Sequence, residues 1–220
     1  LGLMQAVLPE VAKMEGGSQP PEFHPEGDVW THVCLMLEQL EDPTRTLAWG
    51  VLLHDIGKPS TYSEADRIRF NMHEAVGAEM AGDICRRLRM ANADVERISQ
   101  LTAHHMRFRN VREMRPSKLK RFLREEYFPE LLELHRIDCL ASHGMLDLHE
   151  FCSERLAEES REDLQPPPLI SGRDLIAMGF VPGPRFKEIL AAVEDAQLEG
   201  GIRSREAALE LVRERFRPET

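Results

Sequence analysis

The stretch Leu47–Pro59, LAWGVLLHDIGKP, decides how this 220-residue chain folds and what it holds. Its first seven residues are apolar or small and predict a buried helix, which Gly57 and Pro59 bring to an end. His54 and Asp55 end that helix, so an imidazole and a carboxylate are expected to be buried next to each other when the chain folds. Burial of these groups is costly unless a cation compensates for it, and a divalent metal ion is the usual one. The stretch therefore predicts a helical core with metal ligands at its edge.

Two further candidate ligands lie on apolar helix faces elsewhere in the sequence. His32 falls on the inner face of a helix expected over residues 28–41, and Asp138 falls on the apolar face of a helix that begins near Pro129. One such residue is most often a core polar group that is satisfied by hydrogen bonds. Four of them, two being aspartates, indicate a divalent ion with nitrogen and oxygen ligands. The first predicted ligand set is His32, His54, Asp55 and Asp138.

A second set consists of His73, His104 and His105. His73 stands near an expected helix start, where an exposed histidine would also be unremarkable, and the doublet could be one core and one surface residue. Consecutive helical positions differ by about 100°, so both rings can reach one site only where the helix end loosens. We expect these residues to hold a second ion that shares Asp55 with the first.

Helical periodicity dominates the rest of the chain, so the fold class is all-α, a helical bundle with a small C-terminal helical tail. Helices are expected over 1–12, 28–41, 43–55, 73–89, 93–106 and 147–159, with further starts at Pro116, Pro129 and Pro184. Asp42 is expected to cap the helix that follows it, and Ser171 to open a capping box. Residues 60–71 are the one strand candidate, a small hairpin. The expected division is a connecting segment 1–27, a main domain 28–160, a proline-rich linker 161–170 and a tail 171–220.

The net charge of −10 argues against a surface that binds nucleic acid everywhere. Residues 107–124 nevertheless carry eight Arg or Lys and one Glu. Such a run is often only a solvated face, but its position beside the histidine doublet indicates phosphate or RNA contacts. The candidate contacts are Arg107, Arg109, Lys118, Lys120 and Arg121, together with Lys58, whose alternative role is that of a solvated loop lysine.

Compartment and partners follow from the cysteines and the hydropathy. The four cysteines form no CxxC pair, which indicates reduced thiols and a cytoplasmic protein. The longest apolar run has seven residues, too short to cross a bilayer, so no membrane partner is expected.

The ordered ligands resemble a known family. The series His32, His54-Asp55, His73, His104-His105, Asp138 resembles the HD superfamily of metal-dependent phosphohydrolases, which is all-helical and cleaves phosphate esters. The segments PPEFHPEGDVWTHV, LLHDIGKP, NMHEAVGAEMA, ISGRDLIAMGF and PGPRFKEIL also resemble the C-terminal, HD-containing body of bacterial tRNA nucleotidyltransferase/poly(A) polymerase proteins. Those proteins add CCA with a separate N-terminal head, whose DxD carboxylate pair has no counterpart here. Nucleotide addition by this chain alone is therefore not expected.

The resemblance implies a phosphohydrolase for nucleotide or RNA-terminal phosphates. One or two divalent ions (Mn, Fe, Co, Ni, Zn or Mg) would serve as cofactors, with Asp55 and Lys58 as catalytic residues. Expected partners are a phosphorylated nucleotide or an RNA 3′ end, tRNA, and an N-terminal nucleotidyltransferase head if the chain is part of a longer protein. Two alternatives stay open: a non-catalytic tRNA-binding body, and a stand-alone hydrolase of signalling nucleotides.

Overall fold

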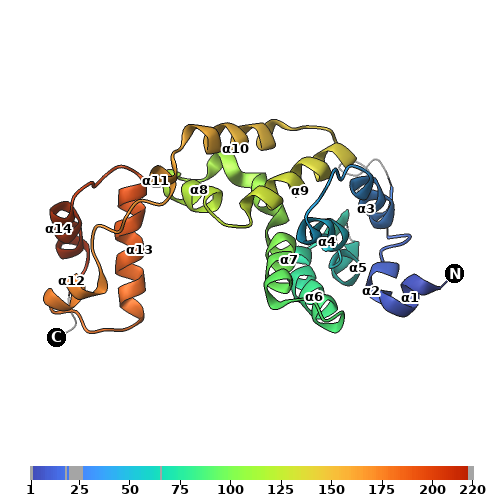
Figure 1. Cartoon of the computed structure of the whole chain (residues 1–220), viewed down its shortest axis with the longest axis horizontal. Coiled ribbons are helices and arrows are strands. Elements are labelled where there is room, and N and C mark those ends of the chain that lie inside the picture. The colour runs from blue at the N-terminus through green and yellow to red at the C-terminus, as the bar shows by residue number, and fades with distance from the viewer. Residues whose placement is uncertain (1, 18, 20–26, 65, 218–220) are drawn as a thin grey trace. The chain divides into compact units, whose positions relative to one another are not determined.

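The computed structural model describes residues 2–17, 19, 27–64 and 66–217. Helices make up 67% of the described residues, and the strands among them form a two-stranded sheet, which confirms the predicted all-α class. Contacts divide the chain into two compact units (Figure 1). The N-terminal unit comprises residues 1–111 and 126–152, and the C-terminal unit comprises 112–125 and 153–220. This division differs from the boundaries expected at 160 and 171, because residues 112–125 pack with the C-terminal part.

The N-terminal unit contains most of the described helices. In chain order, its elements are α1 (Leu3–Val7), α2 (Pro9–Ala12), α3 (Val29–Glu38), α4 (Arg45–Leu53), α5 (Lys58–Thr61), β1 (Tyr62–Glu64), β2 (Ile68–Phe70), α6 (His73–Arg87), α7 (Asn92–His104) and α9 (Phe128–Ala141). The 3-10 helix η1 (His105–Glu113) continues α7, and α10 (Asp147–Glu158) passes from this unit into the other.

Tight helix packing brings the chemically active turns together. Helix α6 packs along α7, α4 packs against α7 and α9, and α3 contacts both α4 and α9 (Figure 1). The turn after α4 presses on the start of α6: a Cβ at Gly57 would lie 2.2 Å from the carbonyl oxygen of His73 and 2.8 Å from the amide of Gly77. Only glycine permits this approach. The HDIGKP turn and the first turn of α6 are thereby held in contact.

The C-terminal unit has a core of its own, which includes Leu175, Ile189 and Val212. Its elements are α8 (Pro116–Leu123), α11 (Arg161–Leu164), α12 (Gly172–Ala177), α13 (Pro184–Leu198) and α14 (Arg205–Arg215). Helix α13 contacts α8, α12 and α14. The capping box predicted at Ser171 is present and includes Asp174.

Most predicted elements are confirmed, and the differences have local causes. The hairpin pairs Tyr62 with Phe70 and Glu64 with Ile68. The first predicted helix is divided at Pro9, which lacks the N–H that would continue α1. The prediction that Asp42 caps the next helix is wrong: Asp42 has a φ of 46°, and Thr44 is the cap, with its side chain accepting from the amide of Leu47. The short α5 and α11 were not predicted.

Two general expectations can be compared with the described part of the chain. All four cysteines are free, and three of them are buried. Over the residues that the structure describes, no helix is both long and apolar enough to cross a membrane. Of the predicted connecting segment 1–27, residues 1, 18 and 20–26 lie outside the described ranges.

Candidate metal centre

Four of the candidate ligands lie at or near the ends of helices, and the other two lie within helices. His54 is the residue that caps the C-terminus of α4, and Asp55 lies in the turn that follows. His73 opens α6 and His105 opens η1, while His32 lies within α3 and Asp138 within α9. Six side chains from the N-terminal unit thus form two adjoining groups. Group A is His32, His54 and Asp138, and group B is Asp55, His73 and His105.

Group A joins three helices through a buried pair of imidazoles and a carboxylate. Nε2 of His32 lies 3.1 Å from Oδ1 of Asp138, and the His32 and His54 ring centroids are 5.6 Å apart. The potential ligand atoms of the group all lie within 4.8 Å of one another. The two histidines are fully buried, whereas the side chain of Asp138 is 23% exposed. Asp138 therefore lies on the side of the group that reaches solvent.

Group B is more compact and fully enclosed. Oδ1 of Asp55 lies 3.4 Å from Nε2 of His73 and 3.7 Å from Nε2 of His105, and those two nitrogens are 3.2 Å apart. Ligand atoms that share a tetrahedral ion at 2.0–2.2 Å stand roughly 3.3–3.6 Å apart. The observed separations are close to that spacing. Group B consequently has the dimensions of a three-ligand site for a divalent transition metal.

The backbone fixes which nitrogen of the His54, His73 and His105 rings faces the cluster. Nδ1 of His54, His73 and His105 lies 2.9, 2.8 and 2.7 Å, respectively, from the carbonyl oxygen three residues earlier in the chain. Each Nδ1–H therefore donates to a main-chain acceptor, and Nε2 of each of these three rings faces the cluster. Such second partners orient histidine ligands in metal sites.

This arrangement fits a bound cation. With both Nδ1 atoms protonated, the Nε2 lone pairs of His73 and His105 face each other at 3.2 Å, beside the Asp55 carboxylate. Two lone pairs in this geometry repel unless a proton or a metal ion lies between them. Imidazole nitrogen and carboxylate oxygen together suit Mn, Fe, Co, Ni and Zn. The residues present are thus suitable for a divalent ion in each group.

Asp55 occupies the junction of the two groups. Its Oδ1 faces His73 and His105, while its Oδ2 lies 3.2 Å from Nε2 of His54 and 2.6 Å from Nζ of Lys58. Burial would raise the pKa of Asp55, but the positive charges of His54 and Lys58 prevail and hold it well below its usual range. The carboxylate is therefore ionised and available to both groups.

The histidines differ in their tendency to hold a proton. Burial lowers the pKa of His54, but the carboxylates of Asp55 and Asp138 outweigh burial and leave it raised. At His105, burial and the neighbouring His54 lower the pKa to about 3. A neutral imidazole is the form that binds a metal, so His105 is prepared as a ligand without the loss of a proton.

The sequence predicts both rings of the doublet in the site, but the structure places only His105 there. The ring of His104 stacks on Tyr127, with centroids 5.3 Å apart. The helical path continues through η1 at this point, so adjacent side chains diverge and cannot converge on one ion. Burial lowers the pKa of His104 as well. Its ring packs against a neighbour and takes no part in either group.

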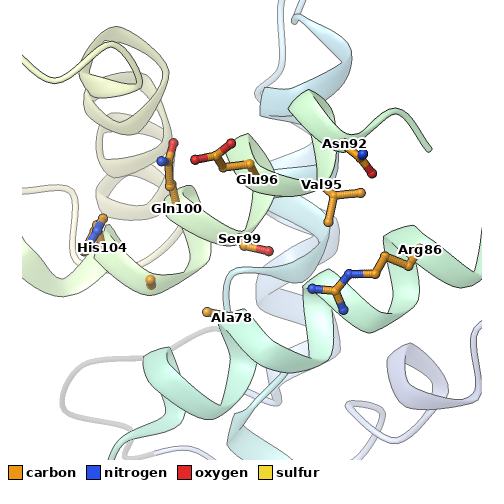
Figure 2. A pocket seen from close by; sticks show the side chains of 9 residues that line it. Ala78, Arg86, Asn92, Val95, Glu96, Ser99, Gln100 and His104 are labelled. Carbon is orange, nitrogen blue, oxygen red and sulfur yellow. The ribbon is translucent and has the colours of Figure 1, made fainter. Parts of the chain in front are cut away.

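His104 also lines a separate surface cavity of about 510 Å³ (Figure 2). The cavity lies over α6 and α7, with Arg86 and Asn92 at one end and His104 at the other. None of the group A or group B residues lines it. The cavity and the candidate metal centre are therefore different places on the N-terminal unit.

The predicted phosphate-binding cations are distributed over both units. Lys58 is 5% exposed and ion-paired with Asp55, which contradicts the alternative of a solvated loop lysine. In the N-terminal unit, Arg107 donates to the hydroxyl of Tyr127 and Arg109 is exposed. In the C-terminal unit, Lys118 is exposed, Lys120 pairs with Glu159 at 2.9 Å, and Arg121 pairs with Glu194 at 2.6 Å and with Asp195.

One residue of this neighbourhood was missed by sequence analysis. The side chain of Gln19 is 5% exposed, and its Oε1 accepts a hydrogen bond of 2.6 Å from Nζ of Lys58. A glutamine in a segment rich in Gly and Pro gives no signal in the sequence. Its role depends on a contact with Lys58, which lies 39 positions away in the sequence.

A helical bundle that directs four imidazoles and two carboxylates toward one cluster defines an α-helical domain with groups that could hold metal ions. The HD domain family matches residues 28–142, and the chain belongs to this family. It is 35% identical over 219 residues to the A-adding tRNA nucleotidyltransferase of Deinococcus radiodurans, a match that covers 92% of this chain and 49% of that protein. It is 32% identical over 218 residues to the CC-adding tRNA nucleotidyltransferase of Thermus thermophilus, covering 94% of this chain and 49% of the relative.

Another relative is the multifunctional CCA protein of Pseudomonas aeruginosa, which is 31% identical over 153 residues, 66% of this chain and 37% of that protein. The chain spans about half the length of the first two relatives. These matches confirm the resemblance identified from the ordered histidines and aspartates.

Proposed function

We propose that this domain is a metal-dependent phosphohydrolase that cleaves phosphate esters of nucleotides or of an RNA end, as part of a tRNA-processing protein. The observation that carries the proposal is the position of Asp55 between the two ligand groups, with Lys58 against the same carboxylate. Related proteins are named for adding nucleotides to tRNA, which supports RNA as the context of the reaction. We propose that tRNA is a partner for the same reason.

The chain's own residues would position the reactants. Group A and group B would each hold one ion, with Asp55 shared between them. Bound divalent ions supply Lewis acidity, which lowers the pKa of water and neutralises phosphate oxygens. Lys58 adds a fixed positive charge beside Asp55, where it can face a phosphate oxygen. Water oxygen would bond to phosphorus as the ester P–O bond breaks, and the leaving oxygen would take a proton.

Turnover by the metal-loaded chain tests this proposal. We expect the protein with Mn²⁺, Ni²⁺ or Mg²⁺ to hydrolyse p-nitrophenyl phosphate or 2′,3′-cyclic AMP, and Asp55→Asn to abolish the reaction. Asp83→Asn is the matched control, because Asp83 lies on α6 with a side chain that is 79% exposed. If the wild-type protein retains metal yet cleaves neither compound, the proposed phosphohydrolase activity is ruled out.

A non-catalytic tRNA-binding body is the second candidate, and the nucleotidyltransferase names of the relatives favour it. In this case the exposed Arg109 and Lys118 are better probes than Arg121, which packs against α13 through its ion pairs. We expect the double variant Arg109→Glu, Lys118→Glu to weaken tRNA binding. Its unfolding transition should match that of the wild type. Unchanged tRNA affinity in this double variant would contradict a role of residues 107–124 in tRNA binding.

A further inference from the structure

Residues 11–17 are held against the core of the N-terminal unit and the start of α3. Val11 and Met14 are buried, and the amide of Val29 donates to the carbonyl of Gly17 at 3.1 Å. The amide of Gly16 also donates to the carboxylate of Asp28, at 3.2 Å. These contacts hold the main chain close to the start of α3, so the residue that follows shortly after, Gln19, is carried to the metal centre.

Gln19 meets the centre through Lys58. Its Oε1 accepts from Nζ of Lys58 at 2.6 Å, and the same Nζ lies 2.6 Å from Oδ2 of Asp55. The orientation of the amide follows from chemistry, because an ammonium group requires the carboxamide oxygen and would repel the NH₂ group. Nε2 of Gln19 is therefore the other terminal atom of this planar group, bonded to the same carbon as Oε1.

That Nε2 is buried, and it has no hydrogen-bond partner in the described part of the protein. A buried donor without an acceptor costs about 1–3 kcal/mol, so such an atom in a folded protein calls for a ligand. The missing group must be an acceptor. Since the Lys58 ammonium lies on the neighbouring atom, an anionic acceptor is favoured over a neutral one.

We infer that Gln19 is an oxyanion-binding residue, whose Nε2–H donates to a non-bridging oxygen of the phosphate group that Lys58 faces. This inference rests on the proposed function for the identity of the anion. Gln19 would fix the direction of one phosphate oxygen, while its Oε1 keeps Lys58 in place. Together with the ion-binding groups, the amide and the ammonium would form a pocket for one phosphate.

Nuclear magnetic resonance of side-chain amides tests the inference directly. The ¹⁵N-labelled chain is loaded with Zn²⁺ and titrated with inorganic phosphate, and the amide pair that is absent from Gln19→Glu is assigned to Gln19. We expect this pair to shift on phosphate addition. The amide of Gln39, an exposed residue at the end of α3, should stay in place. An unmoved Gln19 amide at saturating phosphate would overturn the inference and indicate a structural amide that water satisfies.

Affinity provides the second measurement. Loss of a hydrogen bond to a charged group should raise the dissociation constant for inorganic phosphate about tenfold or more in Gln19→Leu and Gln19→Glu. Gln39→Glu adds the same charge away from the centre and should leave the constant within about twofold. Phosphate affinity unchanged in both Gln19 variants would also contradict the inference.

The outcomes separate this inference from the proposed function. If either variant fails to fold, the Gln19 side-chain amide can be assigned in the wild type through its backbone connectivities. Its shift on phosphate addition then still tests the inference. If phosphate binds with the expected amide shift but no ester is cleaved, the phosphohydrolase fails and the oxyanion site stands. Absence of phosphate binding to the loaded wild-type chain at millimolar concentration would overturn the oxyanion site, whatever the turnover assay gives.

Discussion

Ionisable side chains form a buried cluster in one unit and surface pairs in the other. The N-terminal unit has surface ion pairs too, such as Arg87 with Glu10, but it also holds a buried cluster, in which Asp55 and Lys58 are each about 5% exposed or less and four histidines lie around two carboxylates. In the C-terminal unit, the ion pairs lie at the surface, such as those of Arg121 and Arg124 with Glu194. Burial of charge is costly, whereas surface pairs contribute little. The difference indicates that the first set serves binding and the second set joins helices.

Metal removal should have the largest effect, because the ligands join α3, α4, α6, η1 and α9. An ion present at about 1,000 times its dissociation constant contributes about 4 kcal/mol to the free energy of unfolding. We expect chelation to lower the melting temperature by about 10 °C. Calorimetry before and after chelation measures this. The double variant His54→Ala, Asp55→Ala should contain no such metal by elemental analysis, and chelation should leave its melting temperature unchanged.

Gly57→Ala should be nearly as damaging. The added Cβ would overlap the carbonyl of His73, and the forced separation of the two turns should cost about 3 kcal/mol and weaken metal binding. Urea denaturation of the metal-free protein isolates the packing effect. Gly183→Ala is the control, since a Cβ there meets nothing within 4 Å and its φ of 173° is extended. Equal stability of the two variants would refute the close approach.

Substitution of His105 and substitution of the adjacent His104 should have different effects. His105→Ala removes a ligand of group B, and we expect metal affinity to fall at least about tenfold, as it does when even a ligand's outer partner is lost. His104→Ala removes only the stacking on Tyr127, worth about 1 kcal/mol of unfolding free energy. Metal titration of both variants tests the pair. Loss of metal from His104→Ala alone would reverse the assignment.

Breaking an ion pair of the C-terminal unit should cost less. Glu194→Gln removes the partner of Arg121 and Arg124, but Glu194 is 35% exposed, so solvent screening limits the loss to about 0.5–1 kcal/mol. Urea denaturation at low and high salt measures the difference, which should shrink as salt rises. Metal content should not change. A larger loss that is independent of salt would mean that the pair behaves as a buried one.

The smallest effect concerns the pH dependence of the capping box. The amide of Ser171, followed by Arg205, lowers the pKa of Asp174 from 3.8 to about 2. A lowered folded-state pKa contributes stability that is complete above pH 3.8 and is lost as the pH falls through about 2. Denaturation of wild type and Asp174→Asn over this range should show a difference that disappears at the acid end. A difference that grows as the pH falls would contradict the sign.

The sequence predicted those candidate ligands whose helix faces are otherwise apolar. His32 and Asp138 could be identified because helical spacing places them among core residues, and His54-Asp55 because they end a buried helix. It could not resolve His104 from His105, since the choice depends on how α7 continues into η1. The ion pairs of Arg121 were equally hidden, because Glu194 and Asp195 lie more than 70 positions away.

The main-chain acceptors of the three Nδ1 atoms bear on how the centre tolerates change. Since the carbonyls of Val51, Phe70 and Thr102 set the tautomers, the side chains at those positions can differ without altering which nitrogen faces the ion. The electronic state of the ligands is thereby insulated from ordinary substitution. It is sensitive to anything that rotates a peptide plane, so a proline directly after one of these carbonyls would disturb the coordination chemistry while every ligand remained in the sequence.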